Sequence, residues 1–185
     1  MLKSNKPLQA KTNLKSKTVL KANTKPKKQK KPITQRMRKT ADFWFSRYVR
    51  LRDCTFKDDG WYGTCITCTK TGLVAWIDEK GHLRFTRGWD NGHFVGRGTY
   101  ITRFEDENCN LQCSMRCNNL RSGEYEKYKV ALKIKYGENV PRKLEELAEK
   151  YPATSFHFTK EYLKQVILDS RSQVEWYEKQ AKNPV

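Results

Sequence analysis

Four of the six cysteines stand in two close pairs, which constrain the possible fold more than any other feature of the sequence. Cys65 and Cys68 form a CxxC motif in a glycine-flanked stretch, and Cys113 and Cys117 form a second pair later in the chain. A CxxC turn aims two thiolates at one point, and tetrahedral zinc takes four such ligands. We therefore predict that these four cysteines hold a structural Zn²⁺ ion.

The second cysteine pair departs from the usual spacing. Three residues separate Cys113 from Cys117, whereas two are the norm in zinc-binding pairs. Positions i and i+4 lie on one face of a helix, so both thiols could still bind the ion. Cys109 is the alternative ligand to Cys117, and Cys54 is expected to be a small core hydrophobe. Thiolates rather than disulfides are expected, because the sequence has no features of a secreted protein.

No part of the sequence is apolar over the roughly 20 residues that a transmembrane helix requires. The N-terminus also lacks the apolar run of a secretory signal. The expected location is therefore the cytoplasm.

The basic residues are concentrated at the N-terminus. Residues 1–40 hold 14 of the 38 Lys and Arg residues and none of the 20 Asp and Glu residues, and they contain no aromatic residue. Such a segment buries too little apolar surface to offset the entropy of ordering, so residues 1–39 are predicted to be a disordered basic tail. A polycation of this kind favours a nucleic acid partner. A solubilising or import-like tail is the alternative.

The rest of the chain predicts a mixture of helices and short strands. Thr40 is a plausible N-cap for a helix over 41–53. Three arginines lie on the side of this helix opposite its apolar residues, where they could either bind phosphate or form the solvent-exposed face of the helix. A hairpin is expected from strands at 73–77 and 82–87 joined by a turn at 78–81. A helix is expected at Asn118-Asn119, and helical patterns follow up to 136, over 141–148, and from Thr159 to about 180.

Several ordered motifs resemble the phage NinG (Rap) family of recombination proteins, which is related to HNH-type ββα-metal endonucleases. The resemblance covers about half the chain, from about 44 to 136, and leaves out the tail and the helices beyond about 140. The matching stretches are RYVRLRD at 47–53, CITC at 65–68, DNGHF at 90–94, RFEDEN at 103–108, QC at 112–113, CN at 117–118, SG at 122–123, Tyr128, and YG at 136–137.

The resemblance implies an α+β fold with a small zinc-stapled ββα-metal core of the treble-clef, HNH-like type. The nuclease core with its leading helix would span 40–137, and a helical extension would span 138–185. The implied function is a metal-dependent endonuclease that hydrolyses phosphodiester bonds in branched DNA, such as Holliday junctions and displacement loops, during phage recombination. The implied location is then the cytoplasm of a bacterial host.

The resemblance also implies a set of catalytic residues. His93 would be the general base, because neutral histidine titrates near working pH. Asn118 would bind the catalytic Mg²⁺, with Mn²⁺ as the alternative ion, and Asn108 would position the histidine loop. HNH enzymes commonly place an acidic metal ligand directly before the histidine, but Gly92 stands there. The ligand is therefore expected to be Asp90, with Glu107 or water as alternatives.

Arginines around the expected site are candidates for phosphate contacts. Arg97, Arg103 and Arg121 flank it, and bidentate guanidinium groups suit phosphate. Exposed loop charges are the alternative interpretation. A symmetric homodimer would place two active sites on two strands of a junction, and phage recombination proteins are further expected partners. Two other functions remain open: an HNH nicking endonuclease without branch preference, and a noncatalytic zinc module that binds or anneals DNA.

Overall fold

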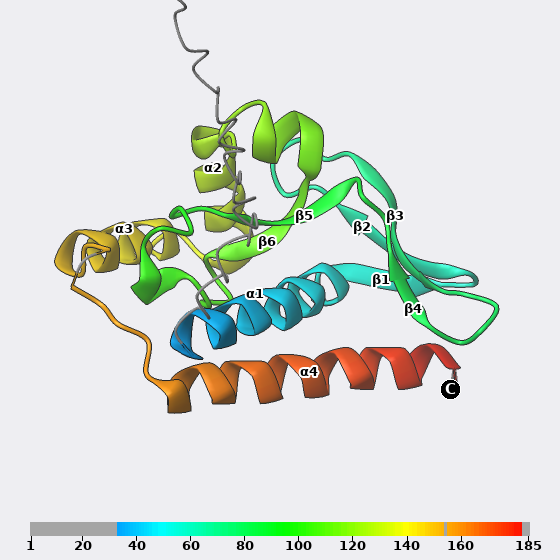
Figure 1. Ribbon diagram of the computed structural model, residues 1–185. Helices are drawn as coiled ribbons and strands as arrows, with labels where there is room; N and C mark the ends of the chain where they lie inside the picture. The colour runs from blue at the N-terminus through cyan, green and yellow to red at the C-terminus, as the bar shows by residue number, and fades with distance from the viewer. Residues whose placement is uncertain (1–32, 154, 183–185) are drawn as a thin grey trace, which may run out of the picture. The chain divides into compact units, whose positions relative to one another are not determined.

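The computed structural model of the protein describes residues 33–153 and 155–182, which belong to one compact unit (Figure 1). Most of the expected basic tail, residues 1–32, lies outside the described residues. Within the described residues the fold is mixed α/β, with two small antiparallel sheets and flanking helices. No helix in this part of the chain is both long and apolar enough to cross a membrane.

The first helix is longer than the sequence patterns predicted. Helix α1 spans Ile33–Arg52, so the helix does not start at residue 41 and the expected domain boundary between residues 39 and 40 falls inside it. The apolar spacing explains the difference, because Met37 continues the buried stripe of Ala41, Phe45 and Val49 one turn upstream. Thr40 does not cap the helix. Its hydroxyl donates instead to the Arg36 carbonyl, at 3.2 Å.

A four-stranded antiparallel sheet follows α1 directly. Its strands are β1 (Cys54–Lys57), β2 (Gly60–Thr64), β3 (Thr71–Ile77) and β4 (Leu83–Phe85), and they pair in sequence order. The β3–β4 hairpin confirms the predicted one. The β1–β2 hairpin was not predicted, because only its turn at residues 58–60 had a clear sequence signal.

A second sheet pairs β5 (Trp89–His93) with β6 (Cys109–Cys113), in a register that sets His93 opposite Cys109. A short π-helical segment, η2 (Ser114–Asn119), continues from β6 and carries Asn118. The chain order is therefore strand, strand, helical turn. The Trp89 indole donates to the Leu73 carbonyl at 2.9 Å, which joins β5 to the larger sheet.

Three C-terminal helices complete the described unit, and they confirm the helical patterns expected after Gly123. Helix α2 spans Tyr125–Tyr136, α3 spans Val140–Lys150, and α4 spans Lys160–Lys182. Helix α4 runs alongside α1 (Figure 1), with Leu163 buried among the core residues of α1 and Val174 packed near Leu51. The helices after residue 138 therefore share the core of residues 40–137.

Candidate metal centre and catalytic cavity

The structure brings together the four cysteines predicted to hold zinc. The ligand atoms of Cys65, Cys68, Cys113 and Cys117 all lie within 4.8 Å of one another. The Cys68 and Cys113 sulfurs are 3.8 Å apart, which is about the edge of a tetrahedron with zinc–sulfur bonds of roughly 2.3 Å. The number, type and spacing of these ligands therefore fit a structural zinc ion.

Backbone bonds form a knuckle around the first cysteine pair. The Cys65 N–H donates to the Lys70 carbonyl at 2.8 Å, and the Thr69 N–H donates to the Cys65 carbonyl at 3.1 Å. Thr69 adopts a φ of 57°, in the left-handed region that a tight turn requires. The Ile66 N–H donates to the Leu111 carbonyl at 3.0 Å, so the knuckle is bonded directly to β6.

The protonation of these thiols differs from one to the next. Burial raises the pKa of the Cys65 thiol, but bonds from the Thr67 hydroxyl and from backbone N–H groups outweigh it and lower the pKa to about 7. Burial raises the pKa of Cys113, and that of Cys117 to about 12. Metal ligands bind as thiolates, so occupation of this centre is coupled to proton release.

The other two cysteines have different surroundings. Cys109, the alternative zinc ligand, is fully buried with Ala41, Phe45 and Leu163, and its sulfur lies 3.5 Å from the Arg103 carbonyl. It is not part of the four-sulfur cluster. The Cys54 thiol donates to the Arg50 carbonyl at 2.8 Å, and burial raises its pKa to about 12.

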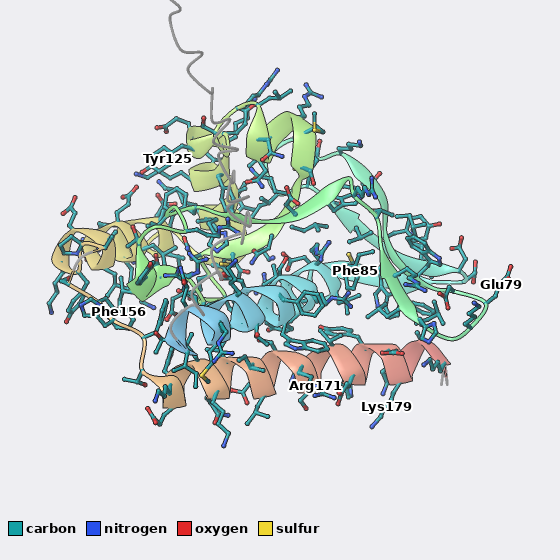
Figure 2. The ribbon with its side chains drawn as sticks, in the orientation of Figure 1. Glu79, Phe85, Tyr125, Phe156, Arg171 and Lys179 are labelled. Carbon is teal, nitrogen blue, oxygen red and sulfur yellow. The ribbon has the colours of Figure 1, made fainter. Side chains whose placement is uncertain are left out.

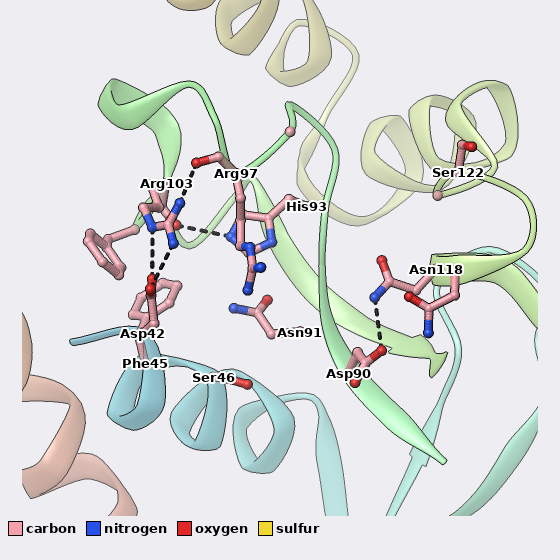
Figure 3. A pocket seen from close by; sticks show the side chains of 14 residues that line it. Asp42, Phe45, Ser46, Asp90, Asn91, His93, Arg97, Arg103, Asn118 and Ser122 are labelled. Carbon is pink, nitrogen blue, oxygen red and sulfur yellow. Dashed lines mark hydrogen bonds and ion pairs between the residues drawn. The ribbon is translucent and has the colours of Figure 1, made fainter. Parts of the chain in front are cut away.

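A cavity of about 490 Å³ lies between α1, β5, the loop after β5, and η2. Figure 3 shows His93, Asp90 and Asn118 around it, together with Arg97 and Arg103. The residues that line the cavity are Asp42, Phe45, Ser46, Asp90, Asn91, His93, Gly96, Arg97, Arg103, Phe104, Asn118, Asn119, Ser122 and Gly123. The cavity is about the size of a small-ligand site.

His93 is held in one orientation by the backbone. Its Nε2 lies 3.2 Å from the Arg103 carbonyl, which can only accept, so Nε2 carries the ring proton and Nδ1 carries the lone pair. Burial, and then the positive charges of Arg97 and Arg103, lower the pKa of His93 to about 4, although the bond to the carbonyl opposes this shift. The ring is therefore neutral at pH 7, and Nδ1 is its unprotonated nitrogen. The Asn91 backbone also interacts with the ring and, like the Arg103 carbonyl, opposes the lowering of the pKa.

The loop that supplies this carbonyl is fixed by an ion pair to α1. The Arg103 guanidinium donates to both carboxylate oxygens of Asp42, each at 2.7 Å, and also to the Arg97 carbonyl (Figure 3). The Arg103 side chain is largely buried. The Asp42 carboxylate therefore compensates the charge of Arg103 within the protein, whereas the sequence analysis predicted that Arg103 contacts phosphate.

Asn108 holds the other end of the histidine loop. This fully buried amide accepts from the Val95 N–H at 2.7 Å and donates to the carbonyls of Val95 and Thr102 at 3.0 and 2.9 Å. The Asn108 carbonyl also accepts from the Phe94 N–H at 2.9 Å. The side chain thus bridges the two ends of the segment between β5 and β6.

Asp90 and Asn118 lie next to each other in the cavity lining. The Asn118 Nδ2 donates to an Asp90 carboxylate oxygen at 2.9 Å (Figure 3). A half-turn of the amide group would present its oxygen instead. Glu107, the alternative ligand, does not line the cavity and pairs with Lys143 at 3.3 Å. Asp90 is therefore the acidic residue that the structure places beside Asn118.

Gly92 has no room for the acidic side chain that HNH enzymes commonly carry at this position. A Cβ there would lie 2.4 Å from the Gln112 Oε1 and 2.8 Å from the Gln112 Cβ. Gln112 is fully buried and donates to Thr67 and to the Gly123 carbonyl. A buried amide occupies the space that a side chain at position 92 would need.

The two remaining predicted arginines differ in their surroundings. Arg97 lines the cavity and is exposed, and within the described residues its side chain makes no ion pair. Arg121 lies outside the lining residues and pairs with Glu124 at 2.6 Å. Of the three predicted phosphate contacts, Arg97 is therefore the one whose charge faces the cavity without a carboxylate partner.

The cavity residues that were not predicted as site residues include Asp42, Ser46 and Asn91. Asp42 carries a signal, because it is the first acidic residue in the chain. The buried Asn91 Oδ1 accepts no hydrogen bond from the described residues. Ser46 has no distinguishing sequence signal on an amphipathic helix.

Comparison with known proteins identifies one family. The family model described as bacteriophage lambda NinG protein matches residues 2–180. The match therefore extends through the N-terminal basic segment and the C-terminal helices, which the sequence motifs had left outside the resemblance. Neither the curated proteins nor the solved structures contain a significant match.

Proposed function

The chain belongs to the bacteriophage lambda NinG family, and on that premise we propose that it is a metal-dependent DNA endonuclease that cuts branched DNA during phage recombination. The observation that carries the proposal is the shared cavity of His93, Asp90 and Asn118. Hydrolysis of a phosphodiester needs a base for the attacking water and a cation for the developing charge. The His93 imidazole is suited to act as the base, and the Asp90 and Asn118 side chains are suited to hold the cation.

In the proposed reaction His93 is the general base. Its Nδ1 lone pair accepts a proton from the attacking water, while Nε2–H stays bonded to the Arg103 carbonyl at 3.2 Å. That bond stabilises the imidazolium as it forms, because the carbonyl dipole faces the ring. Asp42 acts one step further away, since its ion pair with Arg103 fixes the loop that carries the carbonyl.

Asp90 and Asn118 would hold the Mg²⁺ ion. Carboxylate and amide oxygens are the ligands this cation takes, and it commonly keeps several waters and a substrate phosphate beside one or two carboxylates. A bound Mg²⁺ neutralises the charge that develops on the phosphate and on the leaving oxygen. The two side chains already meet at 2.9 Å in the cavity, and rotation of the Asn118 amide supplies its oxygen.

Arg97 would bind a phosphate beside the scissile bond, because it lines the cavity and is exposed. Arg103 would act as a positioning residue for His93, because its guanidinium charge is already paired with the Asp42 carboxylate. The four-thiolate zinc centre would secure the β2–β3 knuckle to β6 and η2, and so hold Asn118 opposite Asp90.

The test compares a four-way DNA junction with a linear duplex of the same sequence. With added Mg²⁺, the protein should cut the junction at least about tenfold faster than the duplex. Equal cutting of the two substrates would indicate a nicking endonuclease without branch preference. Absence of cutting with both Mg²⁺ and Mn²⁺ would refute the nuclease proposal.

A noncatalytic zinc module that binds or anneals DNA is the second candidate. The burial of His93 and its bond to a backbone carbonyl favour it, because a structural histidine has the same surroundings. The presence of Asp90, Asn118 and Arg97 in the same cavity favours the enzyme instead. Substitution of His93 separates the two candidates, because a binding module has no cleavage to lose.

A further inference from the structure

Aromatic rings and guanidinium groups alternate along one side of α1. The Arg47 guanidinium lies 4.4 Å from the Phe43 ring centroid and 4.9 Å from that of Phe85, and the Arg50 guanidinium lies 4.3 Å from Phe85. Phe85 comes from β4 and lies beside the C-terminal half of α1 (Figure 2). Phe43, Arg47, Phe85 and Arg50 are called the stacked ladder below.

The two ladder arginines have no carboxylate partner among residues 33–153 and 155–182. Arg47 makes no ion pair or hydrogen bond there, and the carboxylate that acts on it most, Glu178, pairs with Lys182 at 2.7 Å. Arg50 donates only to the carbonyls of Ser46 and Trp89, at 3.1 and 3.4 Å. A guanidinium packed by its face keeps N–H donors at its edge for another acceptor.

The ladder therefore concentrates like charges on a partly buried surface. Burial lowers the pKa of Arg50 to about 10, and the charge of Arg47 adds to this effect, while the Asp90 carboxylate opposes it. Two cations that disfavour each other are both stabilised when an anion binds between them. Phosphate suits such a site, because it accepts several guanidinium hydrogen bonds at once.

The outer end of the ladder offers an aromatic face. The Phe43 side chain is 49% exposed, and its ring also meets the Trp44 ring edge-on, with centroids 5.2 Å apart. Nucleobases stack on exposed rings of this kind, and an adjacent arginine strengthens the contact. Ring and guanidinium together therefore match a nucleotide whose base is not already stacked in a duplex.

The ladder lies directly beside the catalytic cavity. Ser46 lines the cavity, and it stands three residues after Phe43 and four residues before Arg50. Residues at these spacings are neighbours on a helix surface. Arg50 also donates to the Trp89 carbonyl, next to Asp90. A strand bound along the ladder would thus lead into the cavity.

We propose that the stacked ladder binds single-stranded DNA, with an unpaired base on Phe43 and backbone phosphates on Arg47 and Arg50. The choice of DNA rests on the proposed function. Branched DNA exposes unpaired and unstacked nucleotides at its branch point, so this surface would bring the branch to the cavity.

The test measures equilibrium binding of a fluorescent oligothymidylate and of a short duplex by the full chain, without added Mg²⁺. Arg47→Gln removes one ladder charge, and Phe43→Leu removes the ring but keeps an apolar side chain. The matched controls are Arg142→Gln, at an exposed arginine on α3 that pairs with Glu146 at 3.6 Å, and Phe56→Leu, at an exposed ring of β1. Zinc content and melting temperature are measured for every variant.

Phe43→Leu should weaken single-strand binding by roughly fivefold or more, because base–aromatic stacking contributes about 1–3 kcal/mol per base, and should change duplex binding little. Arg47→Gln should weaken single-strand binding and reduce its log–log salt slope by about 0.7. Phe43→Leu should leave that slope unchanged, and both controls should bind like the unmodified chain.

Unchanged single-strand binding by both ladder variants would overturn the inference. Equal weakening of duplex and single-strand binding by Phe43→Leu would also overturn it, because a stacked base is then not recognised. Binding is measured without the catalytic ion, so a chain that binds through the ladder but cuts no DNA would refute the proposed nuclease and leave the ladder assignment standing.

Discussion

Gly92 stands directly before the proposed base, and the buried amide of Gln112 fills the space beside it. Gly92→Ala should destabilise the fold by about 1–3 kcal/mol, as overpacking does in a well-packed interior, because the new Cβ would lie 2.4 Å from the Gln112 Oε1. Urea unfolding measures the change in free energy.

The control is the same substitution in a Gln112→Ala background, where the amide is gone. The cost of Gly92→Ala should be smaller there by an amount that a double-mutant cycle reports. An equal cost in both backgrounds would show that Gln112 does not exclude a side chain from position 92.

The neutral state of the partly buried His93 makes the stability of the fold depend on pH. Burial lowers the pKa of His93 to about 4, below the ordinary value near 6.5. Between about pH 4 and about pH 6.5, His93 carries a proton in the unfolded chain but not in the folded chain. The contribution of His93 to stability is therefore complete above about pH 6.5 and falls by about 1.4 kcal/mol per pH unit down to about pH 4.

Unfolding free energies at pH 7 and pH 5.5 test this dependence. The unmodified chain should lose roughly 1 kcal/mol more than His93→Gln between these two values. A loss of the same size in both chains would mean that His93 titrates normally in the folded protein.

At the scale of elements, the four-cysteine cluster joins the β2–β3 knuckle to β6 and η2. Cys113→Ser should release the ion and lower the free energy of unfolding by several kcal/mol, because metal binding at a structural site contributes folding free energy. Metal analysis and urea unfolding of the purified chain measure both effects. Cys54→Ser is the control, since Cys54 lies outside the four-sulfur cluster. One retained zinc per chain in Cys113→Ser would rule out this ligand set.

Elements with a strong local pattern could be predicted from the sequence. The β3–β4 hairpin, α2, α3 and α4 each carry a turn, a proline or an apolar stripe, and the clustering of the four cysteines followed from their spacing. The β1–β2 hairpin was missed because only its turn had a clear sequence signal. The start of α1 was missed because Met37 packs against a core cluster that includes the distant residues Phe104 and Leu163. Local patterns do not report such long-range contacts.

The candidate site was predictable to a similar extent. His93, Asp90, Asn118 and Arg97 were singled out, and the structure places all four around one cavity. Asp42 was not singled out from the sequence, because its role depends on an ion pair with Arg103, which is 61 positions away. The same contact removes Arg103 from the free charges that could meet phosphate. Pairing between distant residues therefore decides which charged residues can bind a ligand.

At the scale of the whole molecule, the basic charge outside the described residues should add affinity for DNA of any sequence. Residues 1–32 contain 11 lysines and no acidic residue. Deleting them leaves α1 intact, and it should weaken DNA binding and flatten its salt dependence by about 0.9 in log–log slope for each lost phosphate contact on duplex DNA.

Replacing the 11 lysines with glutamine is the matched control for chain length, and it should reproduce the deletion. Salt titrations of binding by all three chains measure the slopes. An unchanged slope after deletion would show that this segment does not contact DNA.

Cleavage of a four-way junction by the His93→Ala chain tests the catalytic assignment most directly. It is compared with the unmodified chain and with His82→Ala, a substitution at an exposed histidine outside the cavity. Zinc content and junction affinity are measured alongside. We predict that His93→Ala keeps its zinc and its junction affinity but cuts roughly 100-fold to 10,000-fold more slowly, as expected for loss of a general base, while His82→Ala cuts normally. Cutting by His93→Ala at the unmodified rate would contradict the assignment of this cavity as the active site.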